Sequence, residues 1–146
     1  MGYIENIRKV VGNMPIILNS AGIILKDSNN KVLLVNRADT NNWGIPGGYM
    51  ELGETFEQTV DRELYEELGI RLINLSLIHI FSGKEFYHEY PNGDKVYSVI
   101  AIYTADNYEG KIIVDNSEVK EAMFFNSHNL PKELTLNTRK ILEYIL

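Results

Sequence analysis

A chain of 146 residues is long enough for one domain with a sizeable core, and 45% hydrophobic and 23% charged residues are typical of a globular protein. The absence of cysteine excludes disulfides, thiolate metal sites and a cysteine nucleophile, and the net charge of −6 argues against a stable nucleic-acid partner. No segment approaches the roughly 20 apolar residues that span a bilayer, and residues 1–11 lack a signal-peptide core, so we expect a cytoplasmic protein without a membrane partner.

The first third of the chain predicts a helix and two strands. Apolar residues with helical spacing predict a helix within residues 1–12, and Gly12 ends it. Strands are predicted at residues 16–25 and 31–37, with a polar turn between them. A polar loop then leads into a segment rich in glycine and proline at residues 43–48.

The middle of the chain predicts a capped helix. Thr55 is an N-cap residue, and Gln58, three positions later, completes a capping box. Gly69 stands where a helix ends in the left-handed conformation. The core stripe of this helix is formed by residues at i, i+4 and i+8, namely Val60, Leu64 and Leu68.

The negative charge is concentrated around this helix. Residues 51–67 hold seven acids and one base, whereas the rest of the chain holds 13 of each. Like charges packed this closely repel each other. A bound cation would offset the repulsion, although charge alone favours the simpler interpretation of a solvated acidic helix face.

The last half of the chain predicts more strands and a closing helix. Strands are predicted at residues 70–81, 95–104, 111–114 and 122–125, with a hairpin turn at Pro91-Asn-Gly-Asp94 and a helix at residues 138–146. Residues 95–104 are apolar on both alternating faces, as in a central strand covered on both sides. We therefore predict a single α/β domain over residues 1–146, with a mixed sheet between helices.

Three glutamates of the predicted middle helix indicate a metal site. Glu63, Glu66 and Glu67 stand at i, i+3 and i+4, which places their carboxylates on one solvent-facing side, about 5–6 Å apart at Cβ. Mg²⁺ prefers oxygen ligands in octahedral geometry and usually retains waters and substrate phosphates. Three carboxylates leave coordination positions open, as catalysis requires. Arg62 precedes Glu66 by four residues and can hold a carboxylate in place.

Two glycines precede the helix. Gly47 and Gly48 allow the backbone to approach a ligand closely, so the Gly47 carbonyl is a candidate further metal ligand and Gly48 a candidate substrate contact.

At this spacing the sequence resembles the Nudix hydrolase family. All positions of the family's box are present over 23 residues: Gly48, Glu54, Arg62-Glu63-Leu64, Glu66-Glu67 and Gly69-Ile70, after the run-in Trp43-Gly-Ile-Pro-Gly-Gly48. The order of predicted strands is compatible with the family across nearly the whole chain. The resemblance implies a Nudix-type α/β/α sandwich that hydrolyses a nucleoside diphosphate linked to another moiety.

The resemblance also implies roles for the box residues. Glu63, Glu66 and Glu67 would bind divalent metal, Arg62 would orient one of them, and Glu54 would be a secondary carboxylate. Mg²⁺ is the expected cofactor, with Mn²⁺ as a substitute. The metal would neutralise the charge of a phosphoanhydride and activate water, whose proton would pass to Glu66 or Glu67. The family is not uniform on this base, so both remain candidates.

Outside the box the candidates are weaker. Arg37 ends a strand near the box loop, where a phosphate contact and a solvated arginine are equally expected. Glu118 and Glu121 precede the last strand, where many family members place another catalytic or metal-binding glutamate, and Glu118 is the stronger candidate. The aromatic segment 81–90 either packs a hairpin or a dimer interface, or stacks on a base, and we favour packing. Packing is also the favoured role of Trp43.

The substrate and the oligomeric state stay open. Candidate substrates are ADP-ribose or a nucleotide sugar, a nucleoside triphosphate, and, less favoured, a dinucleoside polyphosphate or capped RNA, since an acidic surface disfavours long RNA. A homodimer is a further possibility that the family raises. The competing function is a non-catalytic nucleotide-sensing module on the same fold. Such modules usually lose box carboxylates, and here all are present.

Overall fold

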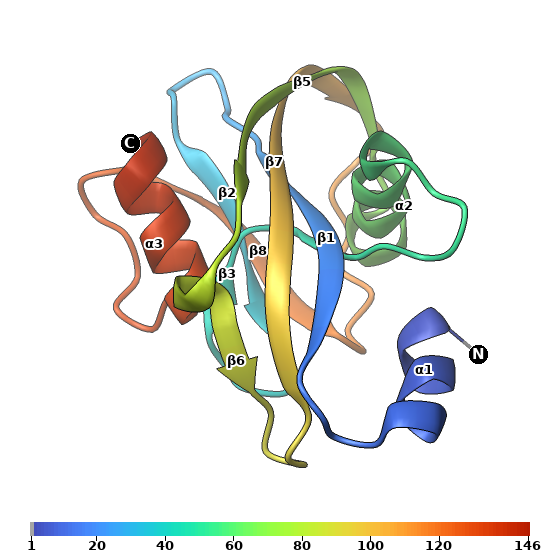
Figure 1. Ribbon diagram of the computed structural model, residues 1–146. Helices are drawn as coiled ribbons and strands as arrows, with labels where there is room; N and C mark the ends of the chain where they lie inside the picture. The colour runs from blue at the N-terminus through green and yellow to red at the C-terminus, as the bar shows by residue number, and fades with distance from the viewer. Residues whose placement is uncertain (1) are drawn as a thin grey trace.

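The computed structural model describes residues 2–146, which fold into three layers. Strands form the central layer, and α2 and α3 lie on opposite sides of it (Figure 1). The helices are α1 (Tyr3–Val11), α2 (Phe56–Leu68), α3 (Leu136–Ile145) and the short 3₁₀ helix η1 (Lys84–Phe86). The predicted α/β/α sandwich is confirmed, and α1 falls within residues 1–12.

The strands form two sheets. They are β1 (Ile16–Ile24), β2 (Val32–Arg37), β3 (Trp43–Gly44), β4 (Gly47–Tyr49), β5 (Arg71–Phe81), β6 (Tyr87–Glu89), β7 (Lys95–Glu109) and β8 (Val119–Phe125). One sheet has the order β4-β1-β7-β5, with β6 also on β7, and the other has the order β3-β2-β8. Among the named strands of residues 2–146, only β1 and β7 pair in parallel, so the first sheet is mixed as predicted. The second, antiparallel sheet was not predicted.

The core lies on both faces of the strands. Successive side chains of a strand point to opposite faces, and Val32, Leu33, Leu34 and Val35 of β2 are all at most 2% exposed. Leu33 and Val35 pack in the cluster that contains the predicted stripe of α2, whereas Val32 and Leu34 pack in the cluster that contains α3. The central β7 alternates in the same way. Both helices are therefore anchored through the same strands.

The ends of α2 follow the sequence prediction. The Thr55 side chain accepts a hydrogen bond from the Gln58 backbone, and the Gln58 side chain accepts one from Thr55 N–H. Gly69 caps the other end in the left-handed conformation, with φ of 71°. These local bonds satisfy backbone groups that a helix end otherwise leaves unpaired, so the position of α2 in the sequence is set by its own caps.

One predicted strand is wrong. Residues 111–114 form no strand, because their backbone bonds the end of α2 instead. Ile113 N–H donates to the carbonyl of Leu68, and Asp115 N–H donates to that of Glu67. The last carbonyls of a helix have no partner within the helix, and this segment supplies partners. Its apolar residues pack against the α2 cluster, which explains their strand-like pattern.

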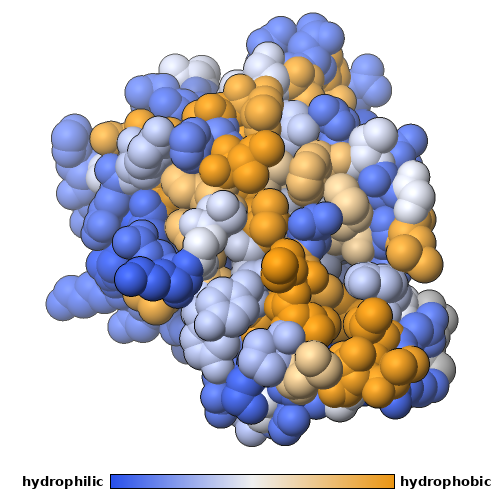
Figure 2. All heavy atoms as spheres, viewed as in Figure 1, coloured by the Kyte–Doolittle hydropathy of each residue, from blue (hydrophilic) through white to orange (hydrophobic). Residues whose placement is uncertain are grey.

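The first helix is attached at the edge of the strand layer. Tyr3 N–H donates to the Glu51 carboxylate, and Arg8 donates to the Lys95 carbonyl and lies 3.7 Å from Asp94. Apolar side chains gather over α1 and up the front of the first sheet (Figure 2), where Ile17 is 71% exposed. None of the helices among residues 2–146 has both the length and the apolar content that crossing a bilayer requires.

Candidate active site

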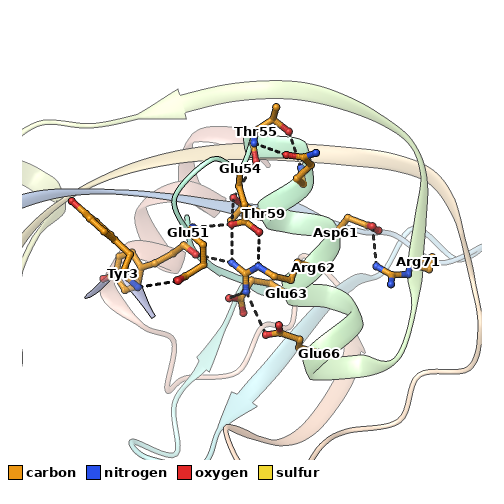
Figure 3. A network of polar contacts seen from close by, with 12 residues as sticks. Tyr3, Glu51, Glu54, Thr55, Thr59, Asp61, Arg62, Glu63, Glu66 and Arg71 are labelled. Carbon is orange, nitrogen blue, oxygen red and sulfur yellow. Dashed lines mark hydrogen bonds and ion pairs between the residues drawn. The ribbon is translucent and has the colours of Figure 1, made fainter. Parts of the chain in front are cut away.

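Arg62 is the centre of a polar network on α2 (Figure 3). Its Nε and Nη2 donate to the two oxygens of Glu54, at 2.6 and 3.0 Å. Its Nη1 donates to Glu63 at 2.9 Å and to Glu66 at 3.3 Å, and Nη2 also donates to the Tyr49 carbonyl at 3.0 Å. The predicted pair with Glu66 is present, but it is the longest of these bonds. Arg62 therefore ties the box loop to two of the three predicted ligands.

Four hydrogen-bond donors hold the carboxylate of Glu54. Besides Arg62, its carboxylate accepts from the Thr59 hydroxyl at 3.0 Å and from Glu51 N–H at 2.8 Å. The hydrogen bond from Arg62 is the main cause that lowers the pKa of Glu54 to about 2, against the opposing effect of burial. Three donors converge on Oε1, and Nε of Arg62 donates to Oε2. Glu54 is thus arranged as the support of Arg62.

Glu67 is buried, contrary to the prediction that all three carboxylates face solvent. Its side chain is 3% exposed, and Oε1 has no hydrogen-bond partner among residues 2–146. Burial, and then the negative charges of Glu63 and Glu118, raise its pKa to about 8, while Arg37 and a backbone hydrogen bond from Gly47 oppose that shift. Only Glu66, 58% exposed at its side chain, is open to solvent. The tertiary fold covers the face that helical spacing leaves free.

Glu63 lies against the backbone of Gly48. A Cβ at position 48 would meet the carboxyl atoms of Glu63 at 2.5–2.7 Å, so any larger residue would displace this carboxylate. A Cβ on Gly47 would lie 2.2 Å from the Ala21 carbonyl in the neighbouring strand β1. Each glycine therefore permits a close approach, one of a carboxylate and one of a strand. The ligand role of the Gly47 carbonyl stays a prediction.

Two candidates outside the box lie at this site. Arg37 ends β2 at a register irregularity, and its charge lowers the pKa of Glu67. Glu118 acts on both Glu63 and Glu67, and its carbonyl accepts a 2.8 Å hydrogen bond from Ala38 N–H. The ends of two segments far apart in the sequence therefore meet beside Glu67. The other candidate, Glu121, lies within β8, in register with Asn36.

The aromatic residues have two roles. Trp43 packs edge-on against Phe125 at 4.9 Å, and the Phe81 and Phe86 rings pack together at 5.7 Å, as favoured from the sequence. Tyr90 differs, because its hydroxyl lies 2.7 Å from that of Tyr49. No sequence signal joins these two tyrosines, since they are 41 residues apart and Tyr49 stands at a box position whose residue type the motif does not specify.

The side chains fit a divalent cation but are not yet arranged around one. Within residues 2–146, no three Asp, Glu, His or Cys side chains form a finished cage, because Arg62 holds Glu63 and Glu66. The unpartnered, buried Oε1 of Glu67 is nevertheless the arrangement that a cation would satisfy. All candidate donors are oxygens, which suit Mg²⁺ or Mn²⁺.

Comparison with known proteins agrees with this geometry. A family model described as the NUDIX domain matches residues 17–145. The ADP-ribose pyrophosphatase of Methanocaldococcus jannaschii is 37% identical over 125 residues, which are 84% of this chain and 68% of that protein. The NAD-capped RNA hydrolase NudC of Vibrio atlanticus is 31% identical over 83% of this chain and 43% of its own length. The chain thus spans about two thirds of the first relative and less than half of the second.

Solved structures show the same fold. A crystal structure of a MutT NUDIX hydrolase from Burkholderia pseudomallei matches with a TM-score of 0.76 and 27% identity, over 90% of this chain and 99% of that one. The NUDIX domain of Shewanella oneidensis NrtR, solved with ADP ribose, matches with a TM-score of 0.68 and 20% identity, over 99% and 97%. At that identity the second match shows the fold alone.

Proposed function

The chain belongs to the Nudix hydrolase family, whose members act on pyrophosphate bonds with a divalent metal, and from this premise we propose that it hydrolyses ADP-ribose with Mg²⁺. The observation that carries the proposal is the buried, unpartnered Oε1 of Glu67, beside Glu63 and within the electrostatic reach of Glu118 and Arg37. ADP-ribose is the first substrate to test because the relative from M. jannaschii carries that activity in its name. Nucleotide sugars and nucleoside triphosphates are the next substrates to test.

Glu63, Glu66 and Glu67 would hold the cation, with the Gly47 carbonyl as a further ligand. Bound there, Mg²⁺ would neutralise phosphate charge and make a water molecule a better nucleophile. Glu67 is the principal ligand in this proposal, since its free oxygen is buried and a bound cation would favour its ionised form. Mn²⁺ would fit the same oxygens.

The other residues position the substrate and move the proton. Arg62 restricts the rotation of Glu63 and Glu66, and Glu54 holds Arg62 in turn. Arg37 lies where it would bind a phosphate oxygen, and Gly48 lets the substrate approach the backbone. Glu66 is the exposed carboxylate, so we assign to it the proton that leaves the attacking water. Glu118 would add a further carboxylate near Glu63 and Glu67.

The proposal is tested on a panel of ADP-ribose, nucleotide sugars and nucleoside triphosphates, run with Mg²⁺, with Mn²⁺ and in EDTA, in which chromatography separates the phosphate monoesters and the pyrophosphate that cleavage of an anhydride releases. We expect hydrolysis of ADP-ribose that EDTA abolishes. In ¹⁸O water, the broken bond is the P–O–P anhydride and the new bond joins water oxygen to phosphorus, so one phosphate product should carry the label. Label on a sugar carbon, or turnover that persists in EDTA, would contradict the proposal. Binding of ADP-ribose without turnover would indicate the sensing module instead.

A further inference from the structure

Tyr49 and Tyr90 join the box loop to the hairpin between β6 and β7. Tyr49 directly follows Gly48, and its carbonyl accepts the hydrogen bond from Arg62. Its hydroxyl lies 2.7 Å from that of Tyr90, and both side chains are partly buried. Tyr49 thus belongs to the box through its backbone and reaches the hairpin through its side chain.

This pair has one hydrogen to spare. Two hydroxyls carry two hydrogens, and the bond between them uses one. The structure gives neither hydroxyl a second acceptor among residues 2–146. A partly buried donor without a protein partner can bind a ligand oxygen at little desolvation cost, because it is already removed from much of the bulk water.

Either hydroxyl of the pair can donate to the other, but nearby charges place Tyr90 close to the candidate active site. Arg37 lies close enough to act on Tyr90, and the same Arg37 acts on Glu67. Arg37, which also pairs with Asp39 at 3.4 Å, is therefore within electrostatic reach of both Glu67 and Tyr90. Burial is the main cause that raises the pKa of Tyr90 far above its ordinary value, so its hydroxyl keeps its hydrogen near neutral pH.

We propose that Tyr90 donates a hydrogen bond to a phosphate oxygen of the substrate, next to Arg37, and that Tyr49 positions Tyr90 by donating to it. The inference rests on the proposed function, since it names a binding residue for the same substrate. An anionic oxygen is favoured over a sugar hydroxyl, because charge-assisted bonds are about twice as strong as neutral ones and the neighbouring Arg37 attracts anions. In a chain of hydroxyls each bond strengthens the next.

The hairpin does not need the Tyr90 hydroxyl in order to form. Tyr90 N–H donates to the Asp94 carbonyl, and Gly93 N–H donates to the Tyr90 carbonyl. Arg8 fixes the same turn from α1, through the Lys95 carbonyl and Asp94. Tyr90→Phe should therefore fold with the hairpin in place, which allows binding to be measured separately from folding.

The experiment compares wild type with Tyr90→Phe, Tyr49→Phe and the control Tyr87→Phe. The control removes a hydroxyl from the same hairpin, where it donates to the exposed Glu89 at 3.4 Å. KM and kcat are measured on ADP-ribose with Mg²⁺, the Kd of inorganic pyrophosphate is measured by calorimetry with excess Mg²⁺, and Tm is measured for all four proteins.

We expect Tyr90→Phe to raise both KM and the pyrophosphate Kd about ten- to a hundredfold, with kcat within about threefold of wild type. Tyr49→Phe should raise both less, and Tyr87→Phe should change neither. An unchanged pyrophosphate Kd in Tyr90→Phe would overturn the inference. If KM rose at the same time, Tyr90 would contact the sugar and not a phosphate, and if only Tm fell, its hydroxyl would be structural. If wild type hydrolyses nothing in the panel, the proposed function fails, whereas the pyrophosphate Kd still decides the role of Tyr90.

Discussion

Arg62 and Glu54 face each other as a paired fork, with Nε 2.6 Å from one carboxylate oxygen and Nη2 3.0 Å from the other. This geometry adds direction to the ion pair, since a planar guanidinium held at two points cannot rotate. The remaining N–H groups of Arg62 then point at Glu63, Glu66 and the Tyr49 carbonyl. The position of two expected ligands thus depends on a glutamate that would not touch the metal.

Removal of this support should lower stability. We expect Glu54→Gln to decrease the free energy of unfolding by about 1–3 kcal/mol, because it removes the nearest of the three carboxylates that pair with a partly buried guanidinium. Urea unfolding at pH 7 in EDTA measures the change, with the exposed Glu143→Gln as control. The folded pKa of Glu54 is about 2, below its ordinary value of 4.5, so its contribution is complete above pH 4.5 and is lost as the pH falls towards 2. A difference between variant and wild type that is the same at pH 2 and pH 7 would contradict this account.

Burial of Glu67 makes stability depend on pH in the opposite direction. Its folded pKa of about 8 lies above the ordinary 4.5, so the folded protein holds this proton more tightly than the unfolded chain does. Stability from the protonated form is complete below pH 4.5 and is lost as the pH rises through 8. In EDTA, we expect the Tm of Glu67→Gln to gain on wild type between pH 5 and 9, on the order of 5 °C. Parallel Tm curves for the two proteins would show that Glu67 does not titrate in this range.

Glutamine substitutions should separate ligands from the proton acceptor. Glu66→Gln and Glu67→Gln should each lower kcat by roughly 10²-fold or more, since an amide neither takes a proton nor offers full charge. Glu67→Gln should weaken Mg²⁺ binding in calorimetry more than Glu66→Gln does, because Glu67 is the principal ligand in the proposal. Glu57→Gln is the matched control on the same helix, because its amide oxygen still accepts from the Tyr103 hydroxyl. Equal losses for all three variants would mean that the helix is merely perturbed.

Gly48→Ala tests the close contact with Glu63. The added methyl would lie 2.5–2.7 Å from the Glu63 carboxyl atoms, so the carboxylate must move. We expect at least roughly tenfold lower kcat, because a displacement of about 1 Å can cost much more than that, together with weaker Mg²⁺ binding. Gly44→Ala is the control, since its Cβ would meet only Thr138 and Thr135. Unchanged Mg²⁺ affinity in Gly48→Ala would show that Glu63 is not a ligand.

Substitution of Glu118 should lower kcat, whereas substitution of Glu121 should not. Glu118→Gln should lower kcat on ADP-ribose at least roughly tenfold, a loss of the size that removal of a catalytic carboxylate can cause, because Glu118 acts on both Glu63 and Glu67. Glu121→Gln should stay close to wild type, since Glu121 lies within β8 and is exposed. The comparison is a steady-state measurement of both variants at saturating Mg²⁺. A larger effect at Glu121 would reverse the assignment.

Interactions between neighbours in sequence could be predicted from the residues themselves. Three such interactions join residues that are three or four positions apart, so the helical repeat alone brings the partners together. They are the capping box of Thr55 and Gln58, the Gly69 cap and the Arg62–Glu66 pair. The apolar stripe of α2 and the central position of β7 follow from the same periodicities. The box and its expected chemistry were therefore readable before any fold was known.

Contacts between distant segments were decided by the tertiary structure. Helical spacing places Glu67 beside Glu63 but cannot say what covers that face, and only the fold buries it near Arg37 and Glu118. Residues 111–114 have the apolar pattern of a strand, yet the unpaired carbonyls at the end of α2 bind the backbone of this segment instead. The hydroxyls of Tyr49 and Tyr90 meet although β4 and β6 lie on opposite sides of the β1–β7 pair, so only the tertiary structure brings them together. A pattern with a period of two or 3.6 residues records which face is buried, but the partner on that face is set by packing across the chain.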